Sequence, residues 1–320
     1  MFNYAPYGPA PWFCFPLMEI SVYMLFLLCF LHARRKGKQY VGYLFGGLVF
    51  GLILEYVNVN CNIGYSYGEY LVMLGRAPHQ IPLCVGVGWG IIIFSSRILS
   101  DELKLPLWTA VAVDCLLAIS IDISMDTVAY RLHMWNWHWG NQNPLTSDWF
   151  GVPYDNFFGW LMVVFFYSSF SRLLEGVFSK VQRFSGLLIR LTPVFAILLS
   201  EAALYVVLVY VDRFLDNHGI HSITRFLCLF SNLALVVFLA WRKRGYPTTW
   251  SSDTTPPALT WLVPAWFHLY FFIWLFSEGF FLESKRMTCI AIANLLLALF
   301  VHIQKVPYFS RWARRTPSPY

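Results

Sequence analysis

Charged side chains are scarce in this 320-residue sequence. Asp, Glu, Lys and Arg together make up 12% of it, whereas a soluble domain carries about 25%. Apolar residues make up 58% and aromatic residues 19%. This composition excludes a large soluble domain, a disordered chain and a coiled coil. It predicts an all-α, polytopic membrane protein with a single integral domain over residues 1–320.

Other features are also missing, and each absence excludes a class of site. The seven cysteines are an odd number and fall mostly in apolar runs, so no disulfide framework is expected. The first 18 residues contain no Lys or Arg, so no signal peptide is expected. The scattered histidines form no His-x-x-x-His pair, and neither a Gly-rich phosphate loop nor a Gly-x-Ser-x-Gly turn occurs. We therefore expect no metal and no cofactor.

What is present is a series of long apolar runs separated by basic clusters. The runs predict eight to nine transmembrane helices, at residues 15–33, 40–58, 80–97, 106–125, 157–174, 188–211, 223–241, 258–276 and 287–304. If the helices alternate in direction, 17 of the 23 Lys and Arg residues fall on one side. This bias predicts an N-terminus outside and a C-terminus in the cytoplasm. Because the basic residues report topology, the net charge of +6 does not indicate a nucleic-acid partner.

Several acidic residues fall where the bilayer would be, which costs about 2.5–3.5 kcal/mol for a central Asp even on the most lenient scale. They are Glu19, Glu55, Asp114, Asp122 and Glu201 within the expected helices, and Asp126 at the outer end of the fourth. At about 100° per residue, Asp114, Asp122 and Asp126 share one helix face. Three acids on one face indicate a functional cavity, although hydrogen bonding between helices is an alternative. Glu19 and Glu201, each alone, are interpreted as packing groups.

Two connections on the outward side are rich in aromatic and polar residues. Residues 55–80 contain three Asn and several Tyr, and residues 126–160 interleave Trp with Asn, His, Arg and Asp. Trp and Tyr collect at membrane interfaces, but an aromatic belt does not need the polar groups between them. These connections favour a pocket for a long apolar ligand with a polar end, which would reach it from the bilayer.

Within these connections, four elements resemble a known family. They are Gly64-x-x-Tyr67 with Tyr65, Asp122-x-x-x-Asp126, Trp135-x-Trp137, and the string from Gly151 to Trp160, Gly-Val-Pro-Tyr-Asp-Asn-Phe-Phe-Gly-Trp. Together they resemble the membrane carotenoid biosynthesis family that includes the CruF-type carotenoid 1,2-hydratases and bisanhydrobacterioruberin hydratase. The resemblance covers about residues 50–175, and the C-terminal helices over 188–304 add nothing to it. One departure is Thr127, which stands where the family pattern often has Pro.

The resemblance implies that water is added across the terminal double bond of an acyclic carotenoid, in a prokaryotic cytoplasmic membrane. Such chemistry needs an acid, a stabilised tertiary carbocation and a positioned water. On this reading Asp122 and Asp126 are the acid–base pair, with Asp114 and Glu55 as the next candidates. The remaining expected site residues bind substrate: Trp135, Trp137 and Trp160 around the cation, and Tyr65, Tyr67 and Asn156 around the water or the new hydroxyl.

Other interpretations stay open at this point. Gly151-Val152-Pro153 could be a turn that starts the fifth helix, with Asn156 as its cap, and Arg131 is expected to pair with Asp126 or Asp148. A carotenoid cyclase would begin with the same protonation. A UbiA-like prenyltransferase is suggested by a second paired element, Asp212-x-x-x-Asp216. A lipid transporter or a non-catalytic membrane scaffold is the alternative outside enzymes.

Overall fold

The fold is known from a computed structural model that describes residues 7–60, 64–139, 143, 147–181, 185–244 and 257–303. Its elements are, in chain order, α1 (Cys14–Lys36), α2 (Lys38–Asn60), β1 (Tyr65–Tyr67), β2 (Met73–Leu74), β3 (Ile81–Pro82), α3 (Leu83–Glu102), α4 (Leu107–Arg131), β4 (Trp135–Trp137), α5 (Tyr154–Phe178), α6 (Ser185–Tyr205), the π-helical turn η1 (Val206–Val211), α7 (Asp212–Asn217), α8 (Ser222–Arg244), α9 (Leu259–Ser277), the 3₁₀ turn η2 (Phe280–Leu282) and α10 (Lys285–Ile303).

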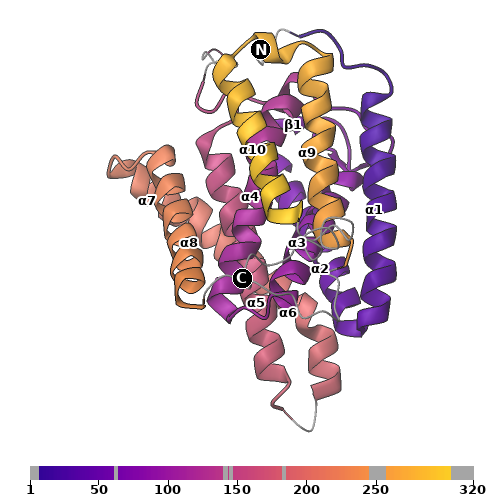
Figure 1. Ribbon diagram of the computed structural model, residues 1–320, viewed down its shortest axis with the longest axis vertical. Coiled ribbons are helices and arrows are strands. Elements are labelled where there is room, and N and C mark those ends of the chain that lie inside the picture. Colours follow the sequence, from indigo (N-terminus) through magenta and orange to yellow (C-terminus); the bar gives the residue numbers. More distant parts are fainter. Residues whose placement is uncertain are drawn as a thin grey trace, which may run out of the picture.

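The expected helical architecture is confirmed. Within the described ranges, nine helices are long and apolar enough to cross a membrane, with α6, η1 and α7 continuous as one of them. They run along the long axis of the molecule in Figure 1 and correspond one to one with the nine expected runs. The predicted orientation rests on basic residues, of which Arg183, Lys305, Arg311, Arg314 and Arg315 lie outside the described residues.

Helices α3 and α4 form the middle of the bundle. Helix α3 packs against α1, α2, α4 and α9, while α4 packs against α3, α5, α8 and α9. Helices α1 and α8 lie at opposite edges of the view in Figure 1. Lipid-facing helices keep large apolar side chains exposed, whereas nearly every residue of α3 from Gly86 to Ser100 is buried. An apolar run buried on all sides is what a central membrane helix requires.

Glycines bring α2 and α3 unusually close together. A Cβ on Gly51 would lie 2.5 Å from the Cβ of Trp89, and one on Gly90 would lie 3.2 Å from the carbonyl oxygen of Leu44. Small residues at a helix crossing let two backbones approach in a membrane, where packing rather than the hydrophobic effect drives association. The close approach places the indole of Trp89 beside Glu55 on α2.

The two polar connections are not irregular loops throughout, because they pair with each other. Strand β1 runs antiparallel to β4, with Tyr65 opposite Trp137, Ser66 opposite Asn136 and Tyr67 opposite Trp135. The sheet lies where α2 and α4 end and where α3 and α5 begin, which we call the sheet end of the bundle. A second short sheet, β2 with β3, leads into α3. The all-α fold therefore carries a small β roof over one end.

The contacts of Arg131 differ from the expected pairing with Asp126 or Asp148. At the end of α4 its guanidinium binds Glu283 between η2 and α10, with nitrogen–oxygen distances of 2.5 and 2.8 Å, and the hydroxyl of Tyr7 donates to the same carboxylate. Helix α4 continues to Arg131, beyond the expected end at residue 125, so Asp126 lies inside the helix. Because α4 extends to Arg131, this side chain lies beyond Asp122 and Asp126 and pairs with Glu283, 152 residues away in the sequence.

Candidate active site

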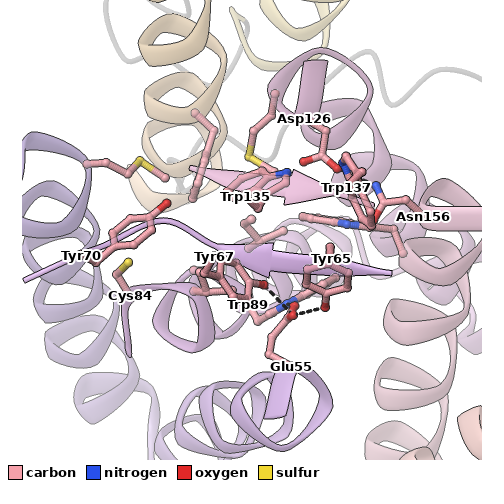
Figure 2. Close-up of a pocket in the computed structure, with 17 residues that line it drawn as sticks. Glu55, Tyr65, Tyr67, Tyr70, Cys84, Trp89, Asp126, Trp135, Trp137 and Asn156 are labelled. Carbon is pink, nitrogen blue, oxygen red and sulfur yellow. Dashed lines mark hydrogen bonds between the residues drawn. The ribbon is translucent and has the colours of Figure 1, made fainter. Parts of the chain in front are cut away.

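A cavity of about 80 Å³ lies beneath the β roof, between α2, α3, α4 and α5 (Figure 2). One buried water needs about 10–15 Å³ of cavity volume, so the space can hold several waters or a small apolar group. All six residues expected to bind substrate line it: Tyr65, Tyr67, Trp135, Trp137, Asn156 and Trp160. Of the four expected catalytic acids, Glu55 and Asp126 line it as well.

The aromatic residues of the roof come to the cavity because of strand geometry. Side chains alternate between the two faces of a strand, and directly opposed residues lie on the same face. Tyr65 and Trp137 are opposed with ring centroids 4.9 Å apart, and Tyr67 and Trp135 are opposed at 6.4 Å. All four rings therefore face the cavity. Burial raises the pKa of Tyr65 and Tyr67 well above that of an exposed phenol, so both remain hydroxyl donors at neutral pH.

Three donors converge on Glu55, which lies near the sheet end of α2. The hydroxyls of Tyr65 and Tyr67 both donate to its Oε2, the latter at 2.6 Å, and the indole nitrogen of Trp89 donates to Oε1 at 2.8 Å. Figure 2 shows the two tyrosines reaching down from the roof to this carboxyl group. Three side chains from two other elements hold Glu55 in one orientation at the cavity wall.

Asp122 and Asp126 form a pair on α4 that is bridged by Asn156 of α5. The side-chain nitrogen of Asn156 donates to Oδ2 of Asp126 at 2.6 Å and to Oδ2 of Asp122 at 3.1 Å. Both carboxyl groups are almost fully buried, and two carboxyl groups brought together by one amide away from water disfavour two adjacent negative charges, which repel each other. Asp126 faces the cavity, with Asp122 behind it.

Asn156 is therefore not the helix cap that its position suggests. The residue at the N-cap of α5 is Pro153, which makes no side-chain hydrogen bond, and the N–H of Tyr154 donates to Oδ2 of Asp148 at 3.1 Å. Gly151, with φ of +95°, makes the turn before it, which is a backbone conformation that glycine adopts without strain. The turn does start the helix, as expected, but the amide of Asn156 points across to α4.

Trp89 is a site residue that the sequence interpretation missed. Besides its bond to Glu55, its ring lies 4.2 Å from the ring of Trp160, centroid to centroid, and both rings line the cavity. A Cβ on the neighbouring Gly88 would meet nothing within 4 Å, because this part of α3 borders the cavity. The available signal was a Trp between two glycines in the middle of an apolar run, far from the interface where tryptophans collect.

Asp114 is the one expected catalytic acid that lies elsewhere. Its carboxylate accepts hydrogen bonds from Ser100 at 2.6 Å and Ser168 at 2.7 Å, and it pairs with Arg172 at 2.9 Å. It shares a helix face with Asp122 but is eight residues away, or about 12 Å along the axis. The polar cluster around Arg172 thus joins α3, α4 and α5 toward the end opposite the sheet.

A second, larger cavity adjoins the first. It measures about 410 Å³ and shares Glu55, Tyr65, Trp89, Trp137, Asn156 and Trp160 with it as a common wall. Its volume lies within the range of about 300–1,000 Å³ that is typical of ligand pockets. The smaller and the larger cavity thus meet at Glu55 and Asn156.

Of the second aspartate pair, Asp212 lines this larger cavity and Asp216 does not. Both bind Arg225 of α8. Arg225 lies 3.0 Å from Asp212, 2.5 Å from Asp216 and 2.9 Å from Asp155. The guanidinium contacts one oxygen of each of the three carboxylates and so offsets the negative charge that a magnesium ion would need there. Among the described residues, no group of three or more His, Cys, Asp or Glu is arranged to hold a metal ion.

Comparison with known proteins decides the family. The family model described as carotenoid biosynthesis protein matches residues 14–224. The chain belongs to this family. The match covers α1 to α7 and every element that lines the two cavities except α9. No curated protein and no solved structure matches the chain.

Membership assigns this integral membrane protein a role in carotenoid biosynthesis. The matched region begins earlier and ends later than the stretch of residues 50–175 that carries the sequence resemblance. It includes α6 and η1, whose residues Leu208 and Val209 border the larger cavity.

Proposed function

We propose that this protein is a carotenoid hydratase that adds water to the terminal trisubstituted double bond of an acyclic carotenoid. The substrate would come from the lipid of a prokaryotic cytoplasmic membrane. The observation that carries the proposal is the meeting of the Asp122–Asp126 pair, Glu55 and a set of aromatic rings at one small cavity. Hydration of an alkene needs an acid, a base and a stabilised carbocation, and this cavity offers a group for each.

Asp126 is proposed as the proton donor. It faces the cavity, while Asp122 and Asn156 hold it from behind. The proton shared by the two carboxyl groups passes from Asp126 to the CH carbon of the double bond, and the pair is left as two carboxylates. The electron pair of the alkene forms the new C–H bond, and a tertiary carbocation remains at the carbon that bears the two methyl groups.

The aromatic rings stabilise this cation. A cation over the face of a Trp within about 6 Å gains about 0.5–2 kcal/mol, most when water is excluded. Trp89, Trp135 and Trp160 line the cavity together with Trp137. Their combined effect favours the charged intermediate over the neutral alkene, which is the differential binding that catalysis requires.

Glu55 is proposed to position and deprotonate the attacking water. The water oxygen forms a bond to the cation, and its proton passes to the Glu55 carboxylate, so the product is a tertiary alcohol and no atom is left unbalanced. Solvent exchange then returns the proton to the Asp122–Asp126 pair. The indole nitrogen of Trp137 is buried without a hydrogen-bond partner among the described residues, and it is a suitable donor for the new hydroxyl.

Hydration is favoured over cyclisation by the polar lining of the larger cavity at the sheet end. Asn58, His138, Asp155 and Asp212 lie there, close to the shared wall with Glu55. A cyclase must exclude water from its carbocation, because an internal double bond has to capture it. A site with a polar cavity beside its carboxylates supplies water instead.

The test is expression in a lycopene-producing bacterium, followed by mass analysis of the pigments. We expect products heavier by one or two waters, and their loss when Asp126→Asn replaces the wild type. An isomeric product without added water would identify a cyclase. Unchanged pigment with a correctly inserted wild-type protein would refute enzymatic action on this substrate and favour transport or a scaffold role.

A further inference from the structure

The larger cavity changes character along its length. Its polar residues lie at the sheet end, whereas its deeper part is lined by Leu54, Val163, Leu208 and Val209. The smaller cavity reaches further into the bundle, to Met18, Ile92 and Phe267. A linear molecule with its reacting end in the smaller cavity would have to place its remaining length in the larger one, because the two meet at Glu55 and Asn156.

One part of the wall of the larger cavity is the π-helical turn η1. Leu208 and Val209 of η1 line the cavity, while Val206 and Tyr210 on the same turn are 51% and 60% exposed. No residue of η1 is buried. The main packing partners of η1 are α6 and α7, its own neighbours along the chain, whereas α6 packs firmly against α2 and α5. Short π-helical turns often occur at functional sites.

Because Gly159 on α5 has no side chain, the part of the larger cavity beside it is open. Gly159 lies one turn after Asn156, lines the larger cavity and not the smaller one, and a Cβ added to it would meet nothing within 4 Å. A Cβ at this position would therefore project into the cavity without displacing protein atoms, and a larger side chain would take up part of the cavity volume.

We propose that the larger cavity binds the polyene chain of the substrate, that this chain enters from the bilayer past η1, and that Gly159 determines which chain lengths fit. The inference rests on the proposed function for the identity of the reacting end. It adds the site for the hydrocarbon, the side of the protein from which the substrate arrives, and a specificity-determining position.

The experiment uses the purified protein in lipid nanodiscs with two substrates that have the same terminal double bond, a full-length acyclic carotenoid and a short acyclic isoprenoid. We expect Gly159→Leu to lower the ratio of kcat/KM for the long over the short substrate by about tenfold or more, since a filled apolar pocket discriminates on this scale. Gly176→Leu is the matched control: it lies on the same helix, also has open space, and lines neither cavity. An unchanged ratio in Gly159→Leu would overturn the chain site.

Access past η1 is tested on the same turn of helix. Leu208→Trp, on the cavity face, should lower kcat/KM for the long substrate, whereas Tyr210→Trp, on the exposed face, should leave it near the wild-type value. Equal values for the two variants would overturn this route.

A binding measurement separates this inference from the proposed function. The long polyene should quench the fluorescence of tryptophans that line the cavity, including Trp139, and Gly159→Leu should weaken the quenching while Gly176→Leu does not. If the wild type hydrates neither substrate but shows this pattern, hydration is wrong and the chain site stands. If hydration occurs and the quenching is the same in all three proteins, the chain site is wrong and hydration stands.

Discussion

The side-chain nitrogen of Asn156 lies 2.6 Å from Oδ2 of Asp126 and joins α5 to α4 at the cavity. Because the same nitrogen also reaches Asp122, one amide orients both carboxyl groups. The donor can serve the pair in either protonation state, since each carboxyl oxygen that it contacts remains an acceptor. Substituting Asn156 alone would therefore remove a hydrogen bond from both carboxyl groups of the proposed acid.

Replacing this amide should impair catalysis more than folding. We expect Asn156→Ala to lower kcat/KM by about 10²–10³-fold, the usual effect of removing one preorganised donor from an active site. Asn232→Ala on α8, where the side chain is exposed and donates to the backbone of Cys228 on its own helix, should have no effect. Wild-type rates in Asn156→Ala would contradict the proposed role of the bridge.

Asp126 and Asp114 should behave differently although they share a helix face. We expect Asp126→Asn to lower kcat by about 10²–10⁴-fold, the range for loss of a general acid, with little change in thermal stability. Asp114→Asn should instead destabilise the protein by about 3 kcal/mol, the lower end of the range for breaking a buried ion pair, because Arg172 keeps Asp101 as a partner.

The measurement for this pair of variants is kcat together with the melting temperature in detergent. The outcome that would contradict the assignment is a reversed pattern, with Asp114→Asn inactive but fully stable and Asp126→Asn unstable but active per folded molecule.

Tyr65 and Tyr67 of the roof should contribute to catalysis by the hydrogen bonds that they donate to Glu55. Removing one donor with Tyr67→Phe should lower kcat by about tenfold or more, because a hydrogen bond to a charged group is worth about 1.5–3 kcal/mol. Burial raises the pKa of Tyr67 far above the ordinary value, so its hydroxyl stays protonated as pH rises. The pH–rate profiles of the wild type and Tyr67→Phe should therefore be parallel from about pH 7 to pH 10.

Tyr56→Phe, on α2 but exposed, is the control for this variant. A loss of wild-type activity near pH 10 that Tyr67→Phe abolishes would show that the phenol titrates in this range, contrary to its burial.

The contact of Arg131 with Glu283 predicts a pH dependence of stability. Burial alone would raise the pKa of Glu283, but its hydrogen bonds with Arg131 and Tyr7 outweigh burial and lower that pKa. A carboxyl group with a lower pKa in the folded state stabilises the protein above its unfolded pKa of about 4.3. This stabilisation is lost as pH falls through the folded pKa.

We therefore expect Glu283→Gln to melt at a lower temperature than the wild type at pH 7, with the difference shrinking as the pH falls below about 4. Glu278→Gln, an exposed acid in the same connection, is the control. A difference between Glu283→Gln and the wild type that does not change with pH would contradict the ion pair.

Most of the helices could be predicted from hydropathy, because an apolar run of about 20 residues has few other stable forms. The depth of the acids could not be predicted from helix periodicity. Asp114 and Asp122 share a face, but the rise of about 1.5 Å per residue places them in different layers of the bundle. The shared helix face therefore led to the wrong expectation that Asp114, which forms an ion pair with Arg172, belongs to the same site as Asp122.

The pairing of β1 with β4 was also beyond local sequence signals. Its strands are three residues long and no tight turn joins them, so their contact depends on how α3 and α4 place their ends. The bond from Trp89 to Glu55 depends in turn on the glycine crossing of α2 and α3. By contrast, the aromatic and amide residues of the site could be predicted from the sequence. A membrane–water interface needs only Trp and Tyr, and here polar side chains alternate with them.

The β roof has a consequence for the order in which the protein is made. Strand β1 leaves the ribosome before α3 and α4, and its partner β4 follows them, so the two strands cannot meet until both helices are in the bilayer. A nascent chain that stops short of β4 would hold Glu55 on an inserted α2 without the covering sheet. Assembly of the proposed site is thus a late event of biogenesis, because it also needs Asn156 and Trp160 of α5 and therefore the insertion of α1 to α5.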